Sequence, residues 1–118
     1  MKDFTMKTVI AKLNMADGKP LFVKIWGEPA DCKACILLVH GLGEHIERYE
    51  HVASMAVERG FCMIGYDQRG HGQTEGKRGV IGKPTQLMDD LQEMLGYAQS
   101  LCGDKSIFLY GHSLGALE

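Results

Sequence analysis

Apolar and polar residues alternate at the start of the chain. Residues 7–13 are typical of a strand, and aliphatic residues occupy alternate positions between Pro20 and Trp26. Asp17-Gly18 lies between these two segments and is a turn signal. The pattern predicts a β-hairpin, which we expect to form the antiparallel edge of a larger sheet.

From residue 34 onward the alternation gives way to short apolar runs. Residues 34–39, 61–66 and 106–110 are apolar throughout most of their length. Runs of this kind are typical of strands that are buried on both faces of a parallel sheet. They therefore predict three parallel strands after the hairpin.

Two helical segments separate the three apolar runs. The first covers residues 48–59 and is followed by Gly60, a helix stop signal. The second covers residues 85–101. The apolar residues of the second segment follow i, i+3, i+4 spacing and are expected to pack in the core: Leu87, Met88, Leu91, Met94, Leu95, Ala98 and Leu101. Strands that alternate with amphipathic helices indicate βαβ units and an α/β fold.

Composition and charge exclude several classes of function. The chain has 118 residues, the size of one small domain, and a net charge of −2 without a basic patch, so nucleic acid is not an expected partner. No apolar run is long enough to span a bilayer, and residues 1–7 lack the features of a signal peptide. We therefore expect a cytoplasmic protein without a transmembrane segment.

The four cysteines fit that expectation. Cys62 and Cys102 lie in apolar segments and are expected to be small buried hydrophobic residues. Cys32 and Cys35 form a C-x-x-C motif, but zinc sites usually need a second such pair, and the sequence has none. A thioredoxin-like motif would follow a strand, whereas this pair precedes one. We favour packing over a metal or redox role and expect neither a metal nor a cofactor.

The strongest motif for chemistry follows the last apolar run. Gly111-His112-Ser113-Leu114-Gly115 matches G-x-S-x-G, in which the serine occupies a sharp turn between a strand and a helix. Such a turn exposes the serine hydroxyl and directs the next backbone N–H at a developing oxyanion. The motif requires a preceding strand, and residues 106–110 supply it.

Two further motifs follow the other apolar runs. Residues 40–45 read His-Gly-Leu-Gly-Glu-His, a glycine-rich turn that can direct a second N–H at the same oxyanion or can be a simple turn into a helix. Residues 67–76 contain three glycines and predict a loop, in which Asp67 and Arg69 can form an ion pair. All three motifs begin at the carboxyl ends of predicted strands, where ligands bind in parallel sheets.

These motifs resemble those of the monoacylglycerol lipase and lysophospholipase-like branch of the α/β-hydrolase superfamily. The matching residues are His40 to His45 with Arg48-Tyr49, Asp67 with Gly70 to Gly76, and Gly111 to Gly115, in the family's order and approximate spacing. The resemblance implies that residues 1–118 are the N-terminal portion of one α/β-hydrolase domain, with a mostly parallel sheet and an antiparallel N-terminal hairpin.

The resemblance also implies a catalytic role for individual residues. Ser113 would be the nucleophile, and the backbone N–H groups of Leu42 and Leu114 would form the oxyanion hole. The substrate would be an ester with a single acyl chain, such as a monoacylglycerol or a lysophospholipid.

Part of the catalytic machinery is missing from these 118 residues. In the family an Asp or Glu and then a His follow the serine, whereas all five histidines precede Ser113 here. We therefore expect an inactive portion of a carboxylic ester hydrolase that lacks the cap and the C-terminal part. The alternative is a non-catalytic folding or assembly module built on the same sheet.

The same absence predicts an exposed strand. In the α/β-hydrolase order the third strand lies between the fourth and the fifth, so residues 106–110 would form an edge without further strands beyond them. This segment is apolar and carries no charge or proline that would protect an edge. We expect self-association, with a two-fold dimer through this strand as the simplest form.

Overall fold

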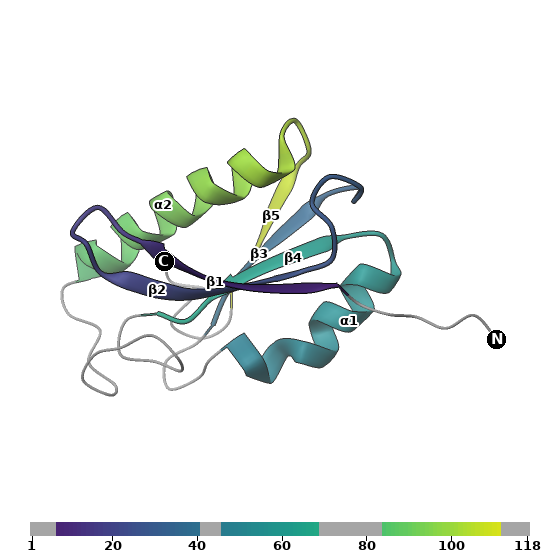
Figure 1. The fold of residues 1–118 in the computed structure, drawn as a ribbon, viewed down its shortest axis with the longest axis horizontal. Coiled ribbons are helices and arrows are strands. Elements are labelled where there is room, and N and C mark those ends of the chain that lie inside the picture. The colour runs from purple at the N-terminus through teal and green to yellow at the C-terminus, as the bar shows by residue number, and fades with distance from the viewer. Residues whose placement is uncertain (1–6, 41–45, 69–83, 112–118) are drawn as a thin grey trace.

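A computed structural model of the chain describes residues 7–40, 46–68 and 84–111. These residues form a five-stranded mixed sheet with a helix on each face (Figure 1). The elements in chain order are β1 (Thr8–Asn14), β2 (Pro20–Trp26), β3 (Cys35–Val39), the short 3-10 helix η1 (Ile46–Tyr49), α1 (Glu50–Glu58), β4 (Cys62–Tyr66), α2 (Pro84–Cys102) and β5 (Ile107–Gly111).

The strand order across the sheet is β1-β2-β4-β3-β5. The hairpin β1–β2 is antiparallel and β2 pairs antiparallel with β4, whereas β3 is parallel to both β4 and β5. This confirms the predicted α/β fold, the hairpin at one edge and the position of the third strand between the fourth and the fifth. Each strand boundary lies within one residue of its prediction.

The hairpin turns at the predicted dipeptide. Gly18 has a φ of +88° and donates its N–H to the Met15 carbonyl oxygen at 2.8 Å. The Met15 N–H in turn reaches the Lys19 carbonyl oxygen at 2.9 Å. Glycine adopts this left-handed conformation without the steric cost that a Cβ atom would add.

The two faces of the sheet bury separate clusters of side chains. On one face Leu37, Ile64 and Tyr66 pack with Leu91 and Met94 of α2. The other cluster joins the sheet to η1 and α1 and comprises Trp26, Leu38, Ile46, Tyr49, Ala53 and Met63. Figure 1 shows α1 and α2 on opposite sides of the strands. Because successive side chains of a strand point to opposite faces, β3 and β4 each supply both clusters, whereas β5 adds only the partly buried Ile107 to the first.

The apolar stripe of α2 is narrower than the sequence suggested. Leu91, Met94 and Ala98 are buried, but Met88 is 43% exposed, so its expected place in the core is wrong. At about 100° per residue, Met88 lies about 60° around the helix from Leu91, on the side away from Met94. The side chain therefore falls at the margin of the face that meets the sheet. The Leu87 side chain lies outside the described part of the chain.

A disulfide joins the beginning of β3 to the end of α2. The Sγ atoms of Cys35 and Cys102 are bonded, and their Cα atoms are 6.8 Å apart. Cys102 is buried as expected, but the bond was not foreseen from the sequence. Cys32 and Cys62 are buried free thiols, and burial raises the pKa of the Cys62 thiol to about 12.

Gly65 in β4 allows the cluster on the α1 face to pack against the sheet. A Cβ atom at this position would lie 3.1 Å from Ile46 Cγ2 and 3.2 Å from Trp26 Cζ3. Both of these side chains are fully buried, so neither can move into solvent. The absence of a side chain at residue 65 is therefore what lets η1 lie against β4.

We expect Gly65→Ala to lower the free energy of unfolding by about 1–3 kcal/mol, because the added methyl overpacks this cluster. Urea denaturation followed by the fluorescence of Trp26, the single tryptophan, measures the change.

The matched control is Gly96→Ala in α2, where an added Cβ meets nothing within 4 Å. This substitution should raise the free energy of unfolding by roughly 0.5–1 kcal/mol, because alanine is the better helix former. A Gly65→Ala variant as stable as the wild type would contradict the packing described for Ile46.

Candidate active site

The three parallel strands end at the same level of the sheet. Val39, the last residue of β3, pairs with Tyr66 at the end of β4 and with Gly111 at the end of β5. The segments that carry all three motifs therefore leave the sheet from one edge. In open α/β sheets, ligands bind beyond this edge, outside the carboxyl ends of the strands.

The predicted catalytic residues themselves lie outside the described residues. Leu42 belongs to segment 41–45, and Ser113 and Leu114 belong to segment 112–118. The structure describes the residues next to them: His40 and Ile46 flank the first segment, and Gly111 precedes the second. Ser113 follows the end of β5 by two residues.

His40 and Gln68 connect the ends of β3 and β4. The Gln68 backbone N–H donates to His40 Nε2 at 2.8 Å, and the Gln68 side-chain amide donates to the His40 carbonyl oxygen at 2.7 Å. His40 is fully buried and Gln68 is 2% exposed. Buried hydrogen bonds of this kind hold the chain in place immediately before segment 41–45. Because His40 Nε2 accepts a hydrogen bond, this nitrogen carries no proton and is already occupied.

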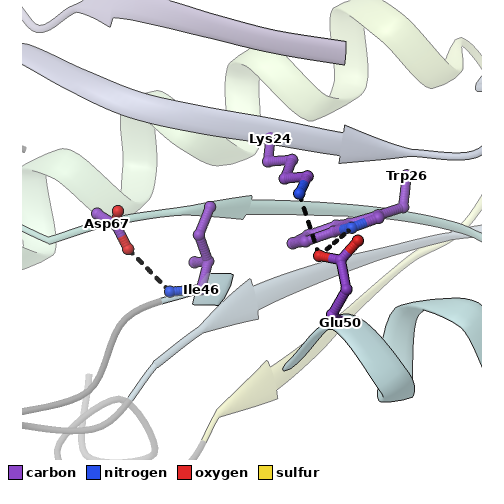
Figure 2. Close-up of polar contacts among 5 residues, drawn as sticks. All are labelled: Lys24, Trp26, Ile46, Glu50 and Asp67. Atoms are coloured by element: carbon purple, nitrogen blue, oxygen red, sulfur yellow. Dashed lines mark hydrogen bonds and ion pairs between the residues drawn. The ribbon is translucent and has the colours of Figure 1, made fainter. Parts of the chain in front are cut away.

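Asp67 holds the other end of that segment. Its Oδ1 accepts a hydrogen bond from the Ile46 backbone N–H at 2.8 Å, as Figure 2 shows. The Asp67 backbone N–H donates to the Phe22 carbonyl oxygen at 2.9 Å. Asp67 therefore ties the start of η1 to β4 and β2. The ion pair predicted between Asp67 and Arg69 falls outside the described residues because Arg69 is not among them.

A third polar group fixes the start of α1 against the hairpin. Glu50 Oε2 accepts hydrogen bonds from Lys24 Nζ at 3.1 Å and from Trp26 Nε1 at 2.9 Å (Figure 2). The Lys24 ammonium also lies 5.4 Å from the centroid of the Trp26 ring, within the range of a cation–π contact. The Glu50 carboxylate, at the first turn of α1, is favourably placed for the helix dipole.

These polar contacts were not predicted from the sequence. Lys24 is separated from Glu50 by 26 positions, and neither belongs to a recognisable motif. Lys24 is only 8% exposed, although alternation along β2 is compatible with a solvent-facing lysine. A buried lysine requires a partner, but the partner becomes known only when the packing of α1 on the sheet is known.

The polar residues described at this edge of the sheet support the candidate site. Their donors and acceptors engage the ends of β3 and β4 and the start of η1. They hold both ends of segment 41–45, which contains the predicted oxyanion donor Leu42.

No helix among the described residues is long and apolar enough to cross a membrane.

The sheet order, the helix on each face and the aligned carboxyl ends together define an α/β-hydrolase fold. A model of the family described as serine aminopeptidase, S33, matches residues 30–117, and the chain belongs to this family of α/β hydrolases.

Curated relatives include the monoglyceride lipases of Rattus norvegicus and Homo sapiens, each 36% identical to this chain over 100 residues. These 100 residues are 85% of this chain but 33% of each lipase, so the chain spans about a third of their length. An uncharacterised abhydrolase domain-containing protein of Dictyostelium discoideum is 36% identical over 93% of this chain and 11% of its own length.

Solved structures of similar fold include a thermostable carboxyl esterase from Bacillus coagulans in complex with glycerol. The superposition has a TM-score of 0.83 at 27% identity, and it covers 96% of this chain and 38% of the esterase. A soluble variant of the monoglyceride lipase from Saccharomyces cerevisiae superposes with a TM-score of 0.79 over 89% of this chain and 36% of the lipase. At 24% identity, this second match bears on the fold alone.

Replacing Gln68 should weaken the connection between β3 and β4. We expect Gln68→Ala to lower the free energy of unfolding by about 1–3 kcal/mol, because it leaves the buried His40 carbonyl oxygen without this donor. Urea denaturation measures the change, and Gln92→Ala, at an exposed position of α2, serves as the control with an expected change within about 0.5 kcal/mol. Equal stability of the two variants would contradict the role of Gln68.

Proposed function

We propose that the protein to which this chain belongs is a serine ester hydrolase with Ser113 as its nucleophile. The observation that carries the proposal is the register of Val39 with Tyr66 and Gly111, because it brings the three motif-bearing segments to one edge of the sheet. The family membership and the G-x-S-x-G spacing around Ser113 support the same assignment.

In the proposed mechanism the Ser113 hydroxyl oxygen attacks the carbonyl carbon of an acyl ester. A general base accepts the serine proton, and the backbone N–H groups of Leu42 and Leu114 stabilise the oxyanion. The alcohol leaves with a proton, and water then releases the acyl group from the serine. The bonds described for His40, Gln68 and Asp67 support the loop that would supply the first of the two N–H donors.

The proposed substrate is an ester with one acyl chain, such as a monoacylglycerol or a lysophospholipid. The named relatives from rat and human are monoglyceride lipases, and the Bacillus coagulans esterase was solved with glycerol. A cytoplasmic location is part of the same proposal.

We further propose that residues 1–118 alone do not catalyse the reaction. An alcohol at neutral pH needs a positioned base to become a competent nucleophile, and no histidine follows Ser113 in this chain. Of the histidines that precede it, His40 already uses Nε2 as an acceptor for the Gln68 N–H.

Ser113→Ala in the whole protein should reduce kcat by on the order of 10⁴- to 10⁶-fold without affecting folding, because it removes the attacking oxygen. Hydrolysis of p-nitrophenyl esters measures the rate, and labelling by a fluorophosphonate should disappear with the hydroxyl. The 118-residue chain should not exceed its own Ser113→Ala variant in the same assay. Wild-type rates in the full-length variant would rule out Ser113 as the nucleophile.

One feature of the described sheet favours assembly as a second function of this chain. β5 pairs only with β3 among the described strands, so its other edge is not covered by any of them. Phe108, Leu109 and Tyr110 are 57%, 56% and 42% exposed, and they are apolar on both faces of the strand. An edge of this kind offers backbone N–H and C=O groups to a second copy of the chain. We propose a two-fold dimer in which two β5 strands pair antiparallel.

Leu109→Lys should convert this dimer to a monomer, because the substitution places like charges near each other across the two-fold axis. Met55→Lys, at a 52% exposed position on α1, is the matched control and should leave the dimer intact. Light scattering coupled to size-exclusion chromatography at micromolar concentrations gives the mass of each species. A folded wild-type monomer under these conditions would refute the proposal.

A further inference from the structure

All four cysteines of the chain meet at the end of the sheet opposite the candidate active site. Cys35 begins β3 and Cys62 begins β4, and these two residues are direct partners in the parallel pairing. Cys102 ends α2, and Cys32 lies in the turn before β3. The sequence showed only one C-x-x-C pair, and the fold brings the two remaining cysteines to it.

The sulfur atoms are spaced as ligands of one metal ion are. Cys32 Sγ lies 3.7 Å from Cys35 Sγ, and the sulfurs of Cys32, Cys35 and Cys62 all lie within 4.8 Å of one another. In a tetrahedral site with zinc–sulfur bonds of about 2.3 Å, the sulfurs are about 3.8 Å apart. Cys102 Sγ, bonded to Cys35 Sγ, is the fourth sulfur of the group.

We propose that the reduced chain binds one Zn²⁺ ion through the thiolates of Cys32, Cys35, Cys62 and Cys102. The disulfide between Cys35 and Cys102 is then the oxidised, metal-free form of the same site. A dithiol reductant supplies two electrons and two protons to the S–S bond and is itself oxidised to a disulfide. Zn²⁺ then binds the four thiols and releases four protons.

The surroundings of the sulfurs suit a closed structural site for a soft metal. Cys35 and Cys62 are fully buried, and Cys102 and Cys32 are 1% and 9% exposed. Thiolates favour zinc over hard cations such as Mg²⁺ and Ca²⁺. The Cα atoms of Cys35 and Cys102 are 6.8 Å apart, at the far end of the range that a disulfide spans, so the two sulfurs can separate without a large backbone movement.

The electrostatics of the cluster and its access to solvent are also compatible with metal binding. A zinc ion with four thiolates carries two negative charges, and the Lys105 ammonium is a nearby positive charge. The opposing Glu28 carboxylate is engaged in an ion pair with Lys7. A cavity of about 130 Å³ lies against Cys32, the most exposed of the four cysteines, and is lined by Glu28, Asp31, Cys32, Val57, Gly60 and Phe61.

Cobalt titration of the full chain tests the proposal, because Co²⁺ bound to thiolates in a tetrahedral site absorbs strongly in the near ultraviolet and the visible. The chain is reduced with a phosphine and handled without oxygen. We expect saturation at one Co²⁺ per reduced chain, displacement by one Zn²⁺, and no such spectrum for the disulfide form. Absence of the thiolate bands in the reduced chain would overturn the proposal.

Single substitutions identify the ligands. Cys62→Ser and Cys102→Ser should each weaken zinc binding by at least about tenfold, because each removes one thiolate. The matched control is His51→Ala, which removes an exposed imidazole of α1 and should leave both affinity and spectrum unchanged. Zinc binding that survives both cysteine substitutions, or that is lost with His51, would contradict the assignment.

A measurement on the wild type alone covers the case in which a cysteine variant does not fold. The reduced chain is treated with iodoacetamide in the presence or absence of one equivalent of Zn²⁺, and mass spectrometry follows modification of each cysteine. Zinc should slow the modification of all four cysteines together. Equal modification rates with and without zinc would overturn the proposal and would not bear on Ser113.

Discussion

The parallel hydrogen bonding of β3 with a strand on each side is the constraint on which the rest of the structure depends. It aligns Val39 with Tyr66 and Gly111, and it divides the side chains of β3 and β4 between two cores. A slip of one residue would move every side chain of β3 to the opposite face. The same pairing places Cys35 beside Cys62 at the other end, about 13 Å from Val39 at roughly 3.3 Å per residue. The motif-bearing segments at one end of the sheet and the thiols at the other are therefore positioned by one set of backbone hydrogen bonds.

Much of this arrangement could be predicted from the sequence because it follows from local patterns. The hairpin turn at Gly18, the end of α1 before Gly60 and the three parallel strands each have a signal within a few residues, although the apolar run of β5 is largely exposed and is not buried on both faces. The strand order was predicted from the resemblance to a family, because no single segment of the sequence determines the order in which strands lie in a sheet. Met88 was placed in the core wrongly because spacing gives the direction of an apolar stripe but not its width.

Contacts between distant segments could not be predicted in the same way. The bonds of Glu50 with Lys24 and Trp26, and those of Gln68 with His40, join residues at least 24 positions apart. The cysteines show the limit most clearly: Cys62 and Cys102 have no motif spacing relative to Cys32, and only the pairing of β3 with β4 and the course of α2 bring their sulfurs together. For the candidate site, the motifs identified the edge of the sheet, whereas the polar residues that support it became visible only in the fold.

The disulfide has a topological consequence when it is formed. It closes a covalent loop between Cys35 and Cys102, which are 67 positions apart, and this loop contains most of β3 together with η1, α1, β4 and α2. A backbone cut anywhere inside the loop would leave two polypeptides that remain joined through sulfur. Such a nicked chain would migrate as one species in a non-reducing gel and would separate into two pieces once the bond is reduced.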